Sequence, residues 1–239
     1  MSIERLHVAT LEALGPGSLL TVDPDESHHL ARVRRAQVGD AVCAHDGRGR
    51  IAKATIERID KGKDRWAVTL RVSEVVEQAP TSPRVEVWAA APKGDRLPAM
   101  IEGLAQVGAA LWRPLLCRRA VVEPRETKID RLRRIAEEAT KQCGRAWTLE
   151  IGEPAPLGRA FEDGVPVLLA DAEGEPPTIV RDPAVRVLIG PEGGFTPEEI
   201  QDIRMRGARA TRFGPHILRI ETAAVVAAAG LLMHATPTR

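Results

Sequence analysis

The sequence predicts an α/β protein with a mainly parallel sheet, preceded by a smaller domain of mostly β structure. In residues 84–239, short apolar runs alternate with segments of helical periodicity, and strands that alternate with helices favour a parallel sheet. Residues 1–78 instead hold several short strand-like runs. Between the two parts, the segment 77–87 contains two prolines with Ser and Thr, which indicates a boundary. We therefore expect domains at residues 1–78 and 79–239.

The N-terminal domain is expected to be a small β-barrel. The sequence DGRGR at 46–50 is typical of the turn of a hairpin. A helix fits residues 26–35, with Asp25 or Ser27 near its start. The expected strands of this domain are residues 40–46, 50–59 and 65–75.

The C-terminal domain is expected to alternate strands and helices along its length. The helix at 126–144 is the clearest, because Ile129, Leu132 and Ala136 share one face and Gly144 stands where a helix commonly ends. In such sheets ligands bind beyond the carboxyl ends of the strands. The expected elements, in order, are a strand at 84–92, a helix at 95–108, a strand at 111–116, the helix at 126–144, strands at 165–171, 185–190 and 210–214, and an alanine-rich helix from about Glu221.

Composition and charge restrict the function. The 239 residues carry a net charge of only +1, from 34 basic and 33 acidic residues, so a nucleic-acid binder must separate its charges in space. Aromatic residues are scarce, with four Trp, three Phe and no Tyr, which argues against an RNA reader built on aromatic stacking. Cys43, Cys117 and Cys143 lack metal-ligand spacing. We expect reduced thiols, no metal, no membrane segment and a cytoplasmic protein.

The loop after the strand at 185–190 suits a neutral or cationic ligand. Its three glycines allow the backbone to come close to a ligand. Thr196 and Glu199 fit a capping box, which occupies the free amides of the next helix, and no Lys follows as a phosphate-binding loop requires. Phosphate binding is therefore disfavoured. The alternative is a tight strand-to-helix turn that binds nothing.

A second Gly-Pro loop follows the strand at 210–214 and continues into Ile217 and Leu218. An apolar loop between two Gly-Pro turns can form a slot for adenine from backbone groups and aliphatic walls. The alternative is that both apolar residues belong to the core. Arg219 and Glu221 come next, at a helix start, and their alternative role is an exposed ion pair of little energetic value.

These two loops together resemble the ribosomal RNA small subunit methyltransferase E family of the SPOUT superfamily. The resemblance is carried by LIGPEGGFTPEE at 188–199 and FGPHILRIETAA at 213–224. Residues 138–145 are similar to the family's Glu-Ala-x-x-Gln-x-x-Arg segment, and residues 28–50 are similar to its PUA-like barrel. The sequence departs from the family pattern at two positions. His216 stands where the family usually has arginine, and Gln106 replaces a glutamate.

The resemblance implies a SPOUT-type trefoil-knotted α/β domain that binds S-adenosylmethionine, preceded by a PUA-like RNA-binding β-barrel. It also implies a homodimer that methylates N3 of a uridine in 16S rRNA, in the small ribosomal subunit. S-adenosylmethionine carries a sulfonium cation and no phosphate, so a glycine loop with an acidic neighbour suits it. The residues expected to form the cofactor pocket are Leu169, Ala170, Gly190, Glu192, Gly193, Phe213, Gly214, Ile217, Leu218 and Thr222.

Three residues are candidates for catalysis. The N3 proton of uracil is weakly acidic. A cation that stabilises the anionic base would therefore help to remove this proton. Arg219 is expected to supply this cation, and Glu221 to orient it or to take a proton through water. Arg145 is expected to hold the target nucleotide. The alternatives are a phosphate or dimer contact for Arg219 and a helix C-terminal partner for Arg145.

Basic residues are concentrated in two regions of this nearly neutral chain. Residues 32–58 hold seven basic against three acidic residues, and residues 113–145 hold ten against five. These excesses favour binding to the RNA backbone, although such runs are often only solvated surface. The residues expected to bind RNA are Arg32, Arg34, Arg35, Arg48, Arg50, Arg118 and Arg119.

The small side chains of residues 221–232 are expected to form the dimer contact, with burial inside one subunit as the alternative. Other functions remain open at this point. One is a SPOUT ribose 2'-O-methyltransferase that acts on tRNA or rRNA, and another is a non-catalytic RNA-binding module. A nucleotide-binding protein is a third, which the absent Lys disfavours.

Overall fold

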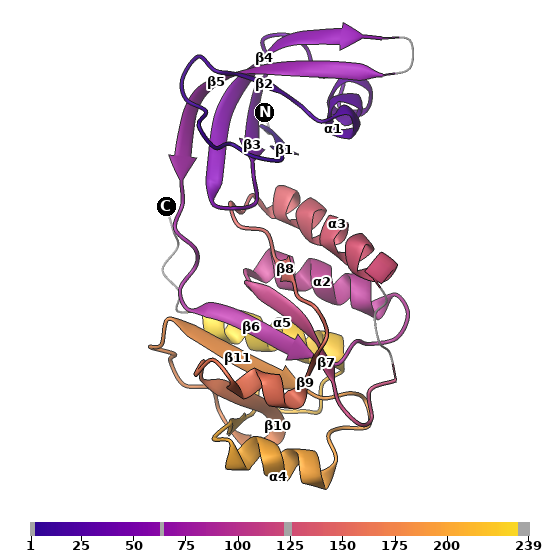
Figure 1. Cartoon of the computed structure of the whole chain (residues 1–239), viewed down its shortest axis with the longest axis vertical. Helices are drawn as coiled ribbons and strands as arrows, with labels where there is room; N and C mark the ends of the chain where they lie inside the picture. Colours follow the sequence, from indigo (N-terminus) through magenta and orange to yellow (C-terminus); the bar gives the residue numbers. More distant parts are fainter. Residues whose placement is uncertain (1–2, 63–64, 122–125, 234–239) are drawn as a thin grey trace. The chain divides into compact units, whose positions relative to one another are not determined.

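The computed structural model describes residues 3–62, 65–121 and 126–233, and it divides into two compact units (Figure 1). The first unit contains the described residues up to Ala79 together with Thr140–Thr148. The second contains those from Pro80 to Ala139 and those from Leu149 onward. The sequence pattern does not indicate that Thr140–Thr148 belong to the first unit. The expected domain boundary between residues 78 and 79 stays a prediction.

The first unit is built on one five-stranded sheet with the order β1-β3-β4-β5-β2. β4 and β5 form a long antiparallel hairpin, and its register shifts between Lys53 and Ala54 and again between Ile56 and Arg58. Such irregularities increase the local twist of a sheet. Side chains such as Leu6 and Leu70 form the buried core beneath it. The strands are β1 (Glu4–His7), β2 (Leu19–Thr21), β3 (Ala41–His45), β4 (Arg50–Lys61) and β5 (Trp66–Glu77).

The helix expected at 26–35 begins earlier and ends sooner. α1 covers Pro24–His28 and continues as a π-helical turn over His29–Val33. Its N-cap is Asp23, whose side chain accepts a hydrogen bond from the Asp25 amide at 2.8 Å. Asp25 lies in the first turn, near the helix start as expected, whereas Asp23 caps the helix. The missed signal was an N-cap aspartate followed directly by a proline at the first helical position.

The segment Thr140–Thr148 joins the first unit through the turn between β3 and β4. The Gly49 amide donates to the Ala146 carbonyl at 3.0 Å, and the Thr148 amide donates to the Gly47 carbonyl at 2.9 Å. Gly47 has φ +66°, and a Cβ there would overlap the Thr148 hydroxyl. The glycine at this turn is therefore required by both conformation and space.

The second unit is an α/β domain in which every strand pairing is parallel, as expected from the sequence. The sheet order is β12-β10-β11-β6-β7-β8, with β9 paired to β7. The strands are β6 (Arg84–Ala89), β7 (Leu111–Leu116), β8 (Glu150–Ile151), β9 (Ala155–Pro156), β10 (Val167–Glu175), β11 (Ala184–Ile189) and β12 (Arg209–Thr211). The helices are α2 (Arg96–Val107), α3 (Glu126–Cys143), a 3₁₀ turn (Leu157–Phe161), α4 (Pro197–Met205) and α5 (Ile220–Leu232).

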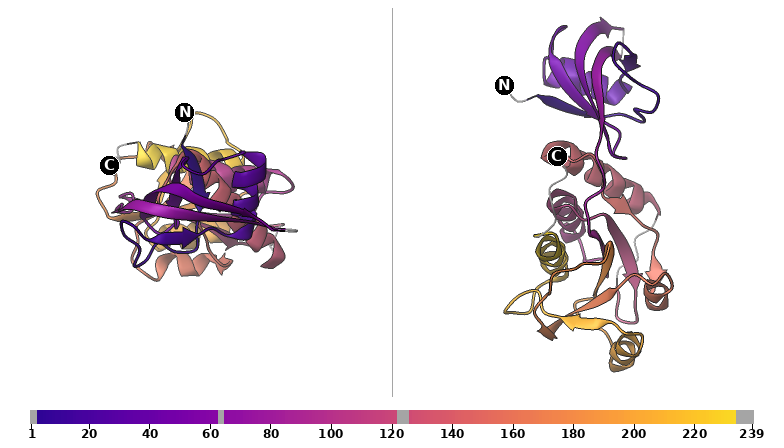
Figure 2. Two further views of the ribbon diagram at one scale, coloured as in Figure 1. Left: turned by 90° about the horizontal axis from the view of Figure 1, so that it is seen from above. Right: turned by 90° about the vertical axis from the view of Figure 1, so that its left-hand side faces the viewer.

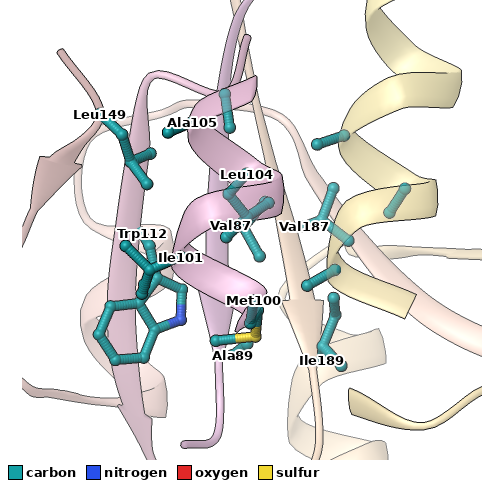
Figure 3. Packing of buried hydrophobic residues seen from close by; sticks show 14 of the residues in the cluster. Val87, Ala89, Met100, Ile101, Leu104, Ala105, Trp112, Leu149, Val187 and Ile189 are labelled. Carbon is teal, nitrogen blue, oxygen red and sulfur yellow. The ribbon is translucent and has the colours of Figure 1, made fainter. Parts of the chain in front are cut away.

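Helices cover both faces of this parallel sheet (Figure 2). Alternate residues of β6 and β11, such as Val87 and Val187, pack against α2, α3 and α5. Figure 3 shows α2, with Met100 and Leu104, packed in front of the strand that carries Val87. Trp88 points to the opposite face, where it packs with residues of the 3₁₀ turn and α4. A Cβ at Gly103 of α2 would lie 2.7 Å from Val225, so this glycine allows α2 and α5 to pack closely.

β10 lies between β11 and β12, so the loops at the carboxyl ends of these three strands are neighbours. This arrangement brings together the segments expected to carry the site. Within the described ranges, no helix is both long and apolar enough to cross a membrane.

Candidate active site

A cleft opens at the carboxyl ends of β10, β11 and β12, where the three loops meet. Its volume is about 530 Å³, within the range of about 300–1,000 Å³ that small-molecule sites have. Apolar side chains, including Leu169, Ile189 and Leu218, form much of its wall, and Glu192 and Asp171 add carboxylates. Arg212, His216 and Arg219 also line it.

The glycine loop between β11 and α4 supplies one side of the cleft. A Cβ at Gly190 would lie 3.0 Å from the ring of Phe195, which is itself buried, so the close approach favours glycine. The Thr196 amide donates to Glu199 Oε2 at 2.8 Å, and the Glu199 amide donates to Thr196 Oγ1 at 3.3 Å. This is the expected capping box. It occupies amides at the start of α4 that would otherwise be free to bind an anion.

Glu192 places a carboxylate at the cleft. It lies 3.7 Å from Arg96 of α2, and both side chains are substantially exposed. An exposed ion pair at this distance is weak. The Glu192 carboxylate is therefore available to a cationic ligand.

The loop between β12 and α5 supplies the other side. Ile217 is 90% exposed and lines the cleft, so the alternative that it is a core residue is wrong. Leu218 is half-buried beside Gly214. The loop thus presents an apolar side chain to solvent at the entrance of the cleft.

Most residues expected to form the cofactor pocket lie on this cleft. Gly193 and Thr222 are the two expected residues that do not line it. Their sequence neighbours Gly194 and Ala223 line it instead. The expected residues on the cleft are Leu169, Ala170, Gly190, Glu192, Phe213, Gly214, Ile217 and Leu218. Lining residues that were not among those expected to contact the cofactor or the substrate are Asp171, Ala172, Ile189, Pro191, Gly194, Phe195, Ile200, Arg212, His216, Ile220 and Ala223. Cofactor contact stays a prediction for the expected residues.

The three expected catalytic residues lie in different surroundings. Arg219 is the N-cap residue of α5, exposed on the cleft, and it forms no ion pair or side-chain hydrogen bond with any described residue. Glu221 is half-buried in the first turn of α5 and does not line the cleft. Neither residue therefore forms the exposed ion pair considered as an alternative. Arg145 belongs to the first unit, and burial lowers its pKa.

Five of the arginines expected to bind RNA belong to the first unit. Arg32, Arg34, Arg35 and Arg48 are exposed, and Arg50 is half-buried. Arg34 forms an ion pair with Glu4 at 3.2 Å, which offsets part of its charge. The RNA contact of this group stays a prediction.

Arg118 and Arg119 of the second unit contact the glycine loop. Arg119 Nη1 donates to the Gly193 carbonyl at 2.7 Å, and the Arg118 amide donates to Glu199 Oε1 at 2.8 Å. The sequence did not indicate these contacts, because they join segments more than 70 residues apart.

Comparison with known proteins identifies the class of protein to which this chain belongs. A family model described as an RNA methyltransferase domain matches residues 79–232, and one described as an RNA methyltransferase PUA domain matches residues 22–63. The chain is 31% identical over 226 residues to ribosomal RNA small subunit methyltransferase E of Mycobacterium bovis, covering 88% of this chain and 85% of the relative. It is 31% identical over 222 residues to the Synechocystis enzyme of the same name, covering 88% and 71%.

Solved structures agree with this result. A methyltransferase of Legionella pneumophila with bound S-adenosylmethionine superposes with a TM-score of 0.85 at 28% identity, over 98% of both chains. The Neisseria gonorrhoeae ribosomal RNA small subunit methyltransferase E, also with S-adenosylmethionine, gives 0.86 at 20% identity over 97% of this chain and 98% of that one, which supports the fold.

The fold and the family models thus define an RNA methyltransferase with an N-terminal PUA domain. The chain belongs to the ribosomal RNA small subunit methyltransferase E family. This confirms the resemblance seen in the two loop segments and the expected pairing of a PUA-like and an α/β domain. The trefoil knot stays a prediction.

Proposed function

We propose that this enzyme transfers a methyl group from S-adenosylmethionine to N3 of a uridine in 16S rRNA. The observation that carries the proposal is the cleft, which combines apolar walls, an acidic side chain and a glycine loop whose following helix is already capped. The names of the relatives support a methyltransferase that acts on small-subunit ribosomal RNA, and the cofactor in the Legionella structure supports S-adenosylmethionine as the methyl donor.

The cleft fits the chemistry of S-adenosylmethionine. Leu169, Ile189 and Leu218 provide aliphatic surface for the adenine ring. Glu192 provides a negative charge that attracts a sulfonium cation. The capped start of α4 offers little to a phosphate, which disfavours nucleotide phosphates as ligands.

Arg219 is the residue proposed to act on the uracil. Methylation at N3 breaks the N3–H bond and the S–CH₃ bond of the cofactor and forms the N3–CH₃ bond. S-adenosylhomocysteine leaves and the proton passes to water, so negative charge must be stabilised on the base as the proton leaves. The guanidinium of Arg219 is permanently charged, lines the cleft, and has no described ion-pair partner to compete for it. Glu221, in the first turn of α5, does not line the cleft itself and is proposed to orient Arg219 or to take the proton through water.

The N-terminal part is proposed to bind the RNA backbone. We propose residues 1–78 as the RNA-binding domain and residues 79–239 as the methyltransferase domain. Exposed arginines such as Arg32, Arg35 and Arg48 supply positive charge in a chain that has almost no net charge. The small ribosomal subunit is the proposed substrate, which implies a cytoplasmic enzyme.

A homodimer through α5 is part of the proposal. Val226 is exposed on this helix, and Met233 is exposed just after it. Together with Thr222 they lie close to one side of the helix by their spacing. The exposed apolar side chains of Val226 and Met233 on this side favour contact with another chain. Sedimentation at micromolar concentration should show a dimer, and a monomer would contradict this part of the proposal.

The reaction is tested by methyl transfer from labelled S-adenosylmethionine into small ribosomal subunits that lack the modification. Nucleoside analysis should find the label in a base-methylated uridine. Label on the ribose would instead indicate a 2'-O-methyltransferase. Cofactor binding without transfer to either position would indicate a non-catalytic RNA-binding protein.

A further inference from the structure

Arg119 reaches from the loop after β7 to the glycine loop of the cleft. Its Nη1 donates to the Gly193 carbonyl at 2.7 Å and approaches the Phe195 carbonyl at 3.5 Å. The stem of Arg119 also packs on Gly193, because a Cβ there would lie 3.5 Å from Arg119 Cδ. One side chain therefore holds two carbonyl groups that flank Gly194.

The segment that Arg119 holds forms a tight turn of the glycine loop. Gly194 has φ +67°, which L side chains rarely adopt, and its amide donates to the Pro191 carbonyl at 2.8 Å to close a tight turn. Phe195 follows, and its buried ring both lines the cleft and rests against Gly190. A shift of this turn would therefore change the wall of the cleft.

A second hydrogen bond joins the loop after β7 to the first turn of α4. The Arg118 amide donates to Glu199 Oε1 at 2.8 Å, while Glu199 Oε2 accepts from the Thr196 amide at 2.8 Å. The side chain of Arg118 itself lies only near Glu198, at 3.8 Å, with both side chains highly exposed. Arg118 thus acts through its backbone, whereas Arg119 acts through its guanidinium.

We infer that Arg119 is a positioning residue of the cofactor cleft: its guanidinium fixes the Gly193–Phe195 turn, and its main effect is on cofactor affinity rather than on RNA binding. The inference rests on the proposed function, because it takes S-adenosylmethionine as the ligand of the cleft. The two hydrogens of Arg119 Nη1 are held in the plane of the guanidinium and suit the carbonyls of Gly193 and Phe195 on either side of Gly194, whereas a lysine ammonium is a point charge on a flexible stem.

The test compares Arg119→Ala, Arg119→Lys and the matched control Arg118→Ala in the full chain. The control removes the same charge from the same loop but keeps the backbone hydrogen bond to Glu199. S-adenosylmethionine binding is measured by calorimetry without RNA. We expect affinity to fall about tenfold in Arg119→Ala, which is the loss of one hydrogen bond to a charged donor. Arg119→Lys should recover part of this loss, and Arg118→Ala should bind as the unaltered protein does.

A second measurement needs no cofactor. Hydrogen exchange of the Gly194 and Thr196 amides should become faster in Arg119→Ala and stay unchanged in Arg118→Ala, because only the first variant releases the turn. RNA affinity should fall equally in both variants or in neither. Unchanged amide exchange in Arg119→Ala, or a selective loss of RNA affinity in that variant, would overturn the inference. Failure of the unaltered protein to bind S-adenosylmethionine would instead reject the proposed function, and the exchange result would still decide the positioning role.

Discussion

Arg186 on β11 and Glu86 on β6 form a buried ion pair across the parallel sheet, with Arg186 Nη2 and Glu86 Oε2 2.7 Å apart. The Arg186 side chain is only 2% exposed. It also contacts Asp163 at 2.7 Å and stacks on the Trp88 ring, 4.4 Å from the ring centre. Arg186 lies on the same strand as Ile189, which lines the cleft, so the ion pair supports the strand that positions the glycine loop.

Glu86→Ala should destabilise the second unit strongly. The change leaves the buried guanidinium of Arg186 without its most buried partner, and breaking such a pair typically costs about 3–5 kcal/mol. Asp163→Ala is the control, because the Asp163 side chain is 54% exposed although Arg186 lowers its pKa through a hydrogen bond. Its cost should stay below about 1 kcal/mol. Urea unfolding measures the loss of unfolding free energy in each variant. Equal losses in the two variants would show that burial does not decide how much each partner of Arg186 contributes.

His45 should make the protein less stable in mild acid. The residue is 3% exposed, and burial, helped by His7 and Lys141, lowers the pKa of His45 from 6.5 to about 4. Its ring nitrogens have no hydrogen-bond partner among the residues that the structure describes. The unfolded chain therefore takes up a proton below about pH 6.5 that the folded chain takes up only near pH 4.

Above pH 6.5, the protonation of His45 does not affect the free energy of unfolding. Between pH 6.5 and pH 4 this free energy falls, by roughly 3 kcal/mol in total, because each pKa unit between the unfolded and folded values is worth about 1.36 kcal/mol. His45→Phe removes the titrating group while keeping an apolar ring. Unfolding free energies measured from pH 7 to pH 4 should fall less steeply in this variant. Parallel curves for the two proteins would show that His45 is not responsible.

The sequence predicts the parallel α/β domain well because its signals are local. Gly144 ends α3 at positive φ, and Thr196 with Glu199 forms the expected capping box. The two loop segments also indicate the strands whose ends meet at the cleft. Periodicity and caps depend on residues within one or two turns of each other, so they can be recognised without the fold.

Other features depend on contacts between distant segments. The Gly49–Ala146 hydrogen bond assigns Thr140–Thr148 to the first unit, and no local pattern encodes it. Asp171 and Arg212 line the cleft only because β10 and β12 are neighbours in the sheet. Arg119 was expected to bind RNA from its charge alone, whereas its hydrogen bond to Gly193 depends on the packing of two loops.

Replacing Arg34, Arg35 and Arg50 together should weaken RNA binding and make it less sensitive to salt. Each lost phosphate contact reduces the slope of log affinity against log salt by up to roughly 0.9, taking the duplex DNA value as a guide. The total change in this slope should be smaller than for three unpaired arginines, because Arg34 already forms an ion pair with Glu4. Arg71→Ala is the control, since Arg71 is engaged by two hydrogen bonds to Glu57. An unchanged slope in the triple variant would show that this surface does not bind RNA.

Arg219→Ala should lower turnover while leaving folding and cofactor affinity nearly intact. Arg219 is exposed, its side chain makes no capping hydrogen bond at the start of α5, and it forms no ion pair within the described part of the chain. Its removal should therefore cost little stability. Loss of one oriented donor to a developing anion typically costs about 2.7–4 kcal/mol, or about 10²–10³ in kcat.

Single-turnover methylation at saturating RNA and cofactor isolates this effect from binding. Arg212→Ala is the matched comparison, because Arg212 is a second exposed arginine that lines the same cleft. A much larger loss in Arg219→Ala than in Arg212→Ala would show that position matters rather than the total positive charge of the cleft. Near-normal turnover in Arg219→Ala would remove Arg219 from the reaction, and Arg145 would then be the next residue to test.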